Sequence, residues 1–197
     1  MIFKPLEISG SWLVELNKYD DNRGYFFESF RFDLINKSLN RKFEVQQSNT
    51  SVSHKGTLRG IHYALNVPSQ AKYIQCLHGC IEDFIIDIRL GSPTFGKFQS
   101  IKLEASNPQA IFIEEGLAHA FVSLLDNSIV TYNVNQIFNP SNEKGINPFD
   151  KTLNIKWPNL DLKLSTKDSD EINLEEAKSK NLLPDYLEMK NYIKSLN

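Results

Sequence analysis

Between residues 10 and 135, the hydrophobic positions of the chain fall into short runs rich in β-branched and aromatic residues. Runs of this kind predict β-strands, here over residues 11–16, 25–30, 46–53, 58–63, 73–77, 80–88, 98–103, 109–113, 120–124 and 128–134. Turn-forming residues separate them, for example at 20–24, 54–56, 91–93, 106–108 and 126–127. A spacing of about 8–12 residues leaves no room for crossover helices, so the pattern predicts an antiparallel sandwich or barrel.

Helical patterns occur in two places. Residues 32–39 can form one or two turns, and the segment 174–196 is the clearer case. Asn173 can cap the start of that segment, and Pro184 interrupts it. Residues 185–193 can then resume the helix.

The rest of the chain adds little regular structure, since residues 140–150 and 159–163 are expected to form loops. A length of 197 residues favours one domain with a sizeable core. The hydrophobic fraction of 41% and charged fraction of 23% are ordinary for a soluble globular protein. We expect the domain to cover residues 1–170, with residues 171–197 as a helical tail packed on it.

The charge balance and the N-terminus exclude several classes of protein. A formal net charge of -2 gives no sign of a nucleic-acid surface, so any anionic ligand must be held by local cations. The N-terminus lacks a signal peptide's apolar core, and no apolar run approaches the ~18 residues that span a bilayer. We expect a cytoplasmic protein without membrane or nucleic-acid partners. Cys76 and Cys80 lack zinc-site spacing and are expected to be reduced, partly buried thiols.

The segment 57–72 carries the most informative candidate chemistry, because it holds Arg59, His62 and Lys72. The planar guanidinium of Arg59 can clamp a phosphate, and His62 can take or give a proton near neutral pH. Lys72 can hold a developing negative charge. This combination suggests proton chemistry on a phosphorylated carbonyl compound.

Each of these residues also has a structural interpretation. A lone histidine in a strand is often structural, and Lys72 can be a solvated lysine at a strand edge. Arg59 and His62 differ by three positions, so a regular pleat sends them to opposite faces. Both can line one pocket only if Gly60 permits a bulge or twist.

Three further residues are candidates. Asp83 lies in a run too apolar to be exposed, so it needs a partner, and a buried lysine is the expected one. His119 starts a strand after a glycine turn. Tyr132 shares a strand face with Val130 and Val134, which also fits a core-facing tyrosine. The four histidines include no His-x-His pair, so no metal site is expected.

Taken in order, these segments resemble the dTDP-4-dehydrorhamnose 3,5-epimerase family, the cupin-fold sugar-nucleotide epimerases, from about residue 3 to residue 170. The landmarks are residues 21–29, 47–49, 58–62, 70–72, 87–96, 115–119, 132, 157–158 and 164–168. The resemblance implies an all-β cupin jelly roll with short peripheral helices. It also implies epimerisation next to the C4 ketone of a dTDP-linked deoxyhexose in a homodimer. No cofactor or metal is implied, since the ketone itself is the electron sink.

The resemblance also assigns roles. His62 matches the base, Asp168 the carboxylate that orients it, Lys72 the cation at the enolate oxygen, and Tyr132 the proton donor. The other matched positions bind the nucleotide or the sugar: Arg23, Glu28, Gln47, Asn49, Arg59, His119, Phe138, Glu143 and Lys167. The segment with Arg23 and Glu28 is expected to cross to a partner subunit. Unperturbed pKa values of about 10 for tyrosine and 6.5 for histidine suit an acid and a base.

Some positions depart from the family pattern. Glu114, Leu117 and Ala120 stand where proline, phenylalanine and glycine are usual, and Phe138 replaces a tyrosine that often stacks on thymine. Phenylalanine can still stack but has no hydroxyl. Residues 70–73, 114–119 and 181–186 look more like the branch that acts in modified-deoxysugar pathways, whose members invert C3, C5 or both.

The leading hypothesis is inversion of C3 and C5 of dTDP-4-dehydro-6-deoxy-D-glucose to dTDP-4-dehydro-L-rhamnose. A single-centre epimerase of another nucleotide-linked 4-keto-6-deoxysugar is the first alternative. A metal-dependent cupin and a non-catalytic sugar-nucleotide binding module are the others.

Overall fold

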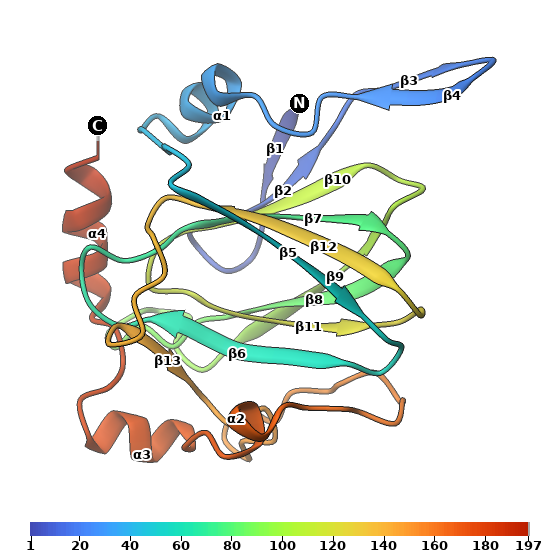
Figure 1. The fold of residues 1–197 in the computed structure, drawn as a ribbon. Coiled ribbons are helices and arrows are strands. Elements are labelled where there is room, and N and C mark those ends of the chain that lie inside the picture. Colours follow the sequence, from blue (N-terminus) through green and yellow to red (C-terminus); the bar gives the residue numbers. More distant parts are fainter. Residues whose placement is uncertain (197) are drawn as a thin grey trace.

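The computed structural model describes residues 1–196 and confirms an all-β fold of two antiparallel sheets packed face to face (Figure 1). The six-stranded sheet has the order β1 (Ile2–Pro5), β2 (Ser11–Glu15), β10 (Gln109–Ile113), β7 (Lys72–His78), β12 (Ser128–Val134) and β5 (Gln47–Ser53). The five-stranded sheet has the order β13 (Glu143–Gly145), β6 (Leu58–Ala64), β11 (Ala118–Ser123), β8 (Cys80–Ile86) and β9 (Phe98–Glu104). From β5 to β13 the chain changes sheet at every connection except β8–β9, as in a cupin jelly roll.

All ten predicted strands occur, with ends within three residues of the expected ones. Three short strands were not predicted. β1 and β13 lie at sheet edges, and β3 (Lys18–Asp21) pairs with β4 (Gly24–Phe27) in a separate hairpin. The prediction that residues 140–150 form only a loop is therefore wrong, because three of them pair with β6. Segments of three or four residues are too short to show an alternation of apolar and polar positions, and they form strands only because a neighbouring strand pairs with them.

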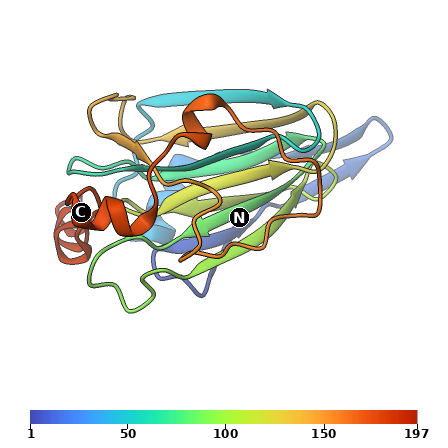
Figure 2. The same ribbon diagram turned by 90° about the horizontal axis from the view of Figure 1, so that it is seen from below.

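The helices are short and peripheral. α1 (Phe32–Leu39) has the predicted bounds, and α2 (Thr166–Ser169) was not predicted. The tail forms α3 (Leu174–Ser179) and α4 (Tyr186–Lys194) at the opposite end of the sandwich from the β3–β4 hairpin (Figure 2). Within residues 1–196, no helix has the length and apolarity to cross a membrane.

Local chemistry sets the ends of the tail helices. The Asn173 side chain accepts a hydrogen bond from the Glu176 amide, which confirms the predicted cap. α3 ends before Pro184 because Asn181 adopts a left-handed conformation with φ +55°. Leu174 of α3 is fully buried in the core beside the five-stranded sheet, so the tail packs on the sandwich.

Apolar side chains fill one part of the space between the sheets. Ile74 and Val130 of the six-stranded sheet pack with Ile85 and Phe121 of the five-stranded sheet, and Tyr132 lies at the edge of this cluster. The free thiols of Cys76 and Cys80 are buried, as predicted.

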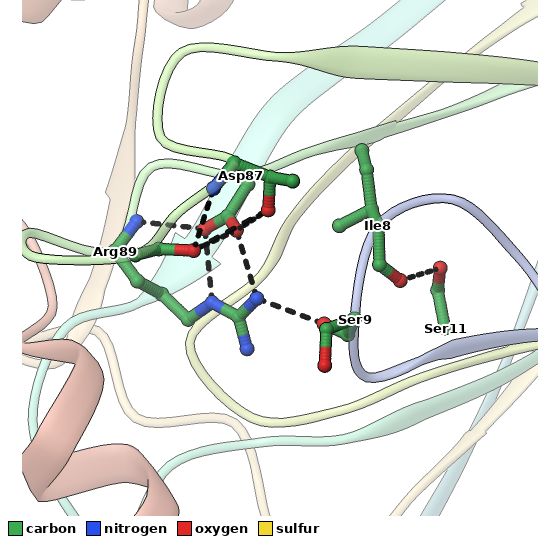
Figure 3. Close-up of polar contacts among 7 residues, drawn as sticks. Ile8, Ser9, Ser11, Asp87 and Arg89 are labelled. Carbon is green, nitrogen blue, oxygen red and sulfur yellow. Dashed lines mark hydrogen bonds and ion pairs between the residues drawn. The ribbon is translucent and has the colours of Figure 1, made fainter.

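A buried ion pair joins the connection after β8 to the N-terminal segment (Figure 3). Arg89 Nε and Nη2 donate to the two Asp87 oxygens at 2.9 and 2.8 Å, and Nη2 also donates to the Ser9 carbonyl at 2.8 Å. The hydroxyls of Ser92 and Thr94 donate to Asp87 Oδ2 at 2.6 Å each. Burial raises the pKa of Asp87, but these hydrogen bonds and the guanidinium charge outweigh it and hold the pKa below its usual value. The landmark 87–96 thus has a structural function.

Candidate active site

A cavity of about 760 Å³ opens between the two sheets, beside the apolar cluster. All predicted site residues except Arg23 and Glu28 line it: His62, Tyr132, Lys72, Asp168, Gln47, Asn49, Arg59, His119, Phe138, Glu143 and Lys167. The chain therefore brings together residues that are far apart in sequence, such as His62 and Asp168, which are separated by 106 positions.

A bulge in β6 directs Arg59 and His62 to the same cavity. His62 pairs with His119 on β11, while Arg59 pairs with Phe121, so β6 carries one residue more than β11 over this stretch. Gly60 lies inside the bulge with φ +119°, and a Cβ there would lie 2.6 Å from the His119 carbonyl oxygen. Only glycine fits this backbone. The predicted dependence on Gly60 is confirmed.

His62 is hydrogen-bonded to a carboxylate that a short helix holds. His62 Nε2 lies 2.7 Å from Asp168 Oδ1, and the His62 side chain is 34% exposed to the cavity. The Ser165 hydroxyl caps α2 by accepting from the Asp168 amide at 3.1 Å. Burial raises the pKa of Asp168, but hydrogen bonding and charge from His62 outweigh it and keep the pKa below its usual value. Because an ionised carboxylate only accepts, Nε2 carries the proton and Nδ1 is the free base.

Lys72 is buried rather than solvated, so its interpretation as a strand-edge lysine is wrong. It is only 5% exposed. Its Nζ donates to Gln70 Oε1 at 2.5 Å. Burial lowers the pKa of Lys72, while the charges of Glu143 and Glu115 act in the opposite direction.

The prediction that a buried lysine partners Asp83 is also wrong. Asp83 Oδ2 lies 2.7 Å from His119 Nε2. Consecutive strands β7 and β8 belong to different sheets, so Lys72 and Asp83 are in different layers, whereas β8 pairs directly with β11. Asp83 is fully buried, and its Oδ1 has no hydrogen-bond partner within residues 1–196. Burial raises its pKa, with the charge of His119 opposing.

Tyr132 reaches the cavity from the six-stranded sheet, whereas His62 and His119 belong to the five-stranded sheet. It pairs with Asn49 of β5 and Ile74 of β7. Burial raises the pKa of Tyr132, Glu143 adds to this and Arg59 opposes it, so the phenol stays protonated at neutral pH. Tyr132 both packs on the core and lines the cavity, which reconciles its two predicted interpretations.

Polar side chains line the rest of the wall. Gln47 Nε2 donates to Asn49 Oδ1 at 2.7 Å, and Gln47 Oε1 accepts from the Phe138 amide at 2.8 Å. Phe138 is exposed at the rim, where a flat ligand can stack on it. The Arg59 guanidinium lines the cavity, where Nε donates to the Ser53 hydroxyl at 3.1 Å and Nη2 donates to the Val52 carbonyl at 3.5 Å.

Arg23 and Glu28 lie away from the cavity of their own chain. Arg23 is at the turn of the β3–β4 hairpin and pairs with Asp21 at 2.6 Å, and Glu28 pairs with Arg31 at 3.4 Å. Figure 1 shows this hairpin extending away from the sandwich. The structure of the single chain therefore does not bring these two residues to the site.

The sequence analysis missed Gln70 as a site residue. Gln70 lines the cavity and holds Lys72. Its position two residues before Lys72, within the landmark 70–72, was the available signal. Among residues 1–196, His, Cys, Asp and Glu side chains form no group of three or more that could hold a metal ion.

Comparison with known proteins gives one consistent family. Residues 5–176 match the family model described as dTDP-4-dehydrorhamnose 3,5-epimerase. A dTDP-4-dehydrorhamnose 3,5-epimerase of Streptomyces griseus is 38% identical over 194 residues, which cover 98% of this chain and 96% of that protein. The Mycobacterium tuberculosis rmlC epimerase has a similar structure, with a TM-score of 0.97 and 36% identity over 100% of both chains. ChmJ, a 3'-monoepimerase from Streptomyces bikiniensis in complex with dTDP-quinovose, gives a TM-score of 0.95 and 36% identity over 98% of each chain.

Proposed function

Because the chain belongs to the dTDP-4-dehydrorhamnose 3,5-epimerase family, a family of isomerases that act on sugar nucleotides, we propose that it inverts both C3 and C5 of dTDP-4-dehydro-6-deoxy-D-glucose. The product is dTDP-4-dehydro-L-rhamnose. The observation that carries this proposal is the approach of His62 and Tyr132 to one cavity from opposite sheets. Inversion needs a base and an acid on opposite faces of the sugar ring.

The first half of each inversion is proton removal. His62 Nδ1 takes the proton from the carbon next to the C4 ketone, and the C–H electron pair moves to the C4 oxygen to give an enolate. Asp168, hydrogen-bonded to Nε2 at 2.7 Å, stabilises the imidazolium that forms. The Lys72 ammonium stabilises the enolate oxygen, and because Lys72 is buried, little water competes for this charge.

The second half is proton return from the other side. Tyr132 donates its phenolic proton to the same carbon, and the enolate electrons re-form the C4 carbonyl. His62 then loses its proton to water and Tyr132 regains one, which restores the enzyme for the other centre. The reaction requires no redox cofactor, because the ketone of the substrate accepts and returns the electron pair.

Substrate binding uses the outer part of the cavity. We assign the diphosphate to Arg59, because a guanidinium fork matches phosphate oxygens. Phe138 provides a surface for the base, and Gln47, Asn49 and Lys167 complete the polar wall. The dTDP-quinovose bound to ChmJ supports a dTDP-linked 6-deoxysugar as the ligand class.

The β3–β4 hairpin supports a homodimer in which Arg23 and Glu28 complete the partner's cavity. Tyr19, Tyr25 and Phe26 expose aromatic rings on this hairpin. Aromatic residues are enriched in protein interfaces. The projecting hairpin is therefore the element proposed to reach the second subunit.

A single-centre 3-epimerase is the second candidate. ChmJ is a 3'-monoepimerase, and its fold and identity to this chain are close to those of the rmlC epimerase. The two activities share the same base, acid and enolate. They differ in whether the second carbon is also presented to His62.

Incubation with dTDP-4-dehydro-6-deoxy-D-glucose in heavy water, followed by proton NMR, tests the proposal. We expect deuterium at both C3 and C5 and a product with the L-rhamno configuration. Deuterium at C3 alone would establish the single-centre activity instead. An absence of exchange at both carbons, with a correctly folded protein, would reject epimerisation of this substrate.

A further inference from the structure

The Lys72 ammonium is held by a neutral group, the side-chain amide of Gln70, rather than by a carboxylate. Nζ donates to Gln70 Oε1 at 2.5 Å. Gln70 is itself buried and lines the same cavity. A neutral acceptor fixes the ammonium in position without cancelling its charge, which a carboxylate partner would largely do.

The orientation of the Gln70 amide is determined by its two partners. Oε1 accepts from Lys72, which can only donate. Nε2 of Gln70 donates to the main-chain carbonyl oxygen of Gln136 at 3.0 Å, and a carbonyl oxygen can only accept. The reverse orientation of the amide would lose both hydrogen bonds, so the oxygen is directed at Lys72.

The segment that holds Gln70 is itself connected to the C-terminal helix. Gln136 Nε2 donates to the Tyr192 hydroxyl of α4 at 3.3 Å. Next to it, Asn135 Oδ1 accepts from the Ala71 amide at 2.8 Å. Residues 135 and 136 therefore fix both the side chain of Gln70 and the backbone that leads to Lys72.

The ionisable groups around Lys72 come from several elements. Glu143 of β13 and Glu115 of the β10–β11 connection act on it by charge. Tyr132 of β12 and the two histidines of β6 and β11 line the same cavity. The direct hydrogen-bond partner of the ammonium is none of these ionisable groups but the neutral amide of Gln70.

We propose that Gln70 is a positioning residue that holds the Lys72 ammonium against the cavity as a neutral acceptor, and that Gln136 and Tyr192 of α4 fix Gln70 in turn. This inference rests on the proposed function for the role of Lys72 at the enolate oxygen. The placement of Lys72 itself can be measured without substrate. The C-terminal helix thereby contributes to the active site although it lies at one end of the sandwich.

The test compares Gln70→Glu and Gln70→Met in the ligand-free full-length protein. Lysine side chains are labelled with carbon-13, and the Lys72 signal is the one that disappears in Lys72→Arg. We expect the Lys72 pKa to rise by about one unit or more in Gln70→Glu, where a carboxylate favours the ammonium. We expect it to fall by a similar amount in Gln70→Met, where the buried charge loses its acceptor.

A matched pair of tyrosines tests the contribution of α4. Tyr192→Phe removes the hydroxyl that accepts from Gln136, so the Lys72 pKa should move in the same direction as in Gln70→Met, by less. Tyr63→Phe is the control, because its hydroxyl also binds the C-terminal region, at the Leu182 carbonyl, without contacting Gln136. It should leave the Lys72 pKa unchanged.

Kinetics give the second measurement. In Gln70→Met, kcat should fall about tenfold or more while KM stays within about twofold, since the amide acts on the enolate through Lys72. Unchanged Lys72 pKa values in both Gln70 variants would overturn the proposal, and equal values in the two tyrosine variants would remove α4 from it. A protein that never turns over but shows the expected pKa order would reject the proposed function and leave the role of Gln70 standing.

Discussion

Two imidazole–carboxylate pairs are built on neighbouring strands of the five-stranded sheet. His62 pairs with Asp168 and His119 with Asp83, each at 2.7 Å, and the two histidines are directly opposite each other on β6 and β11. The surroundings differ. The His62 side chain is 34% exposed and its carboxylate is on a capped helix, whereas the His119 side chain is 10% exposed and Asp83 is in the dry interior.

The difference appears in the acidity of the two carboxyl groups. Hydrogen bonds and charge outweigh burial at Asp168 and keep its pKa low, while burial dominates at Asp83 and raises its pKa. A carboxylate that stays ionised can stabilise a newly formed imidazolium, whereas a carboxyl group with a raised pKa is protonated more readily and then has no charge to do so. The two pairs have the same hydrogen-bond distance, but their carboxyl groups differ in how readily they stay ionised. This difference favours His62 over His119 for the proposed role of base, and it fits the proposal that His119 is a fixed residue of the cavity wall that contacts the sugar.

The largest expected effect comes from replacing the two histidines in turn. His62→Asn removes the base, so kcat should fall by about 10³-fold or more. His119→Asn keeps the base and should cost about tenfold, mainly in KM. Steady-state rates from proton NMR give both values. If His119→Asn is the more damaging change, the assignment of the two histidines is reversed.

Replacing the two carboxylates should lower kcat in the same order, with Asp168 more important than Asp83, but by smaller factors than replacing the histidines. Asp168→Asn removes the charge that stabilises the His62 imidazolium and lets the ring take the wrong tautomer, so kcat should fall about a hundredfold. Asp83→Asn should change kcat by less than about tenfold. Equal losses in kcat for the two variants, with circular dichroism showing intact folds, would contradict the distinction between the pairs.

Arg59 extends the comparison to binding, since the β6 bulge places it near His62. Arg59→Lys keeps the charge but loses the fork of donors, so KM should rise about tenfold with little change in kcat. Lys180→Arg is the control, because it exchanges one cation for another at a residue that pairs with Glu176 of α3, outside the cavity. An unchanged KM in Arg59→Lys would assign the diphosphate to other residues.

The smallest effect concerns stability as a function of pH. Asp168, whose pKa is lowered by folding, stabilises the protein above its unfolded pKa of about 3.9, and this is lost as pH falls through the folded pKa. Asp83, whose pKa is raised, destabilises the protein above its folded pKa and is relieved as pH falls.

Urea unfolding at pH 7 and pH 3 should therefore show opposite trends. Relative to wild type, Asp168→Asn should become more destabilising as pH rises, and Asp83→Asn should become less so. Trends of the same sign would mean that the two carboxyl groups do not differ in the way their burial indicates.

The sequence predicted the strands well because alternating apolar runs report burial on one face. It could not predict β1 and β13, whose pairing depends on neighbouring strands. It also assigned Asp83 the wrong partner. A buried lysine was expected, but the buried Lys72 lies on β7 in the other sheet and His119 comes from the paired strand β11.

The site residues that the resemblance identified line one cavity, except for Arg23 and Glu28, and the resemblance did not identify Gln70. Arg23 lies at the turn of the projecting β3–β4 hairpin and Glu28 directly follows β4, so neither reaches the cavity of its own chain. Gln70 was overlooked because a glutamine has no charge or pKa that marks it. The three-dimensional contact with Lys72 shows what the short sequence separation alone did not, that the Gln70 side chain binds the ammonium.

The most direct test of the account is the fate of the substrate with Tyr132→Phe in heavy water, because it separates proton removal from proton return. His62 should still exchange the C–H proton and give it back from its own side. The account predicts recovered substrate that carries deuterium with its original configuration, while inversion slows about a hundredfold or more. Deuterated product of inverted configuration, formed as fast as by the wild type, would contradict it.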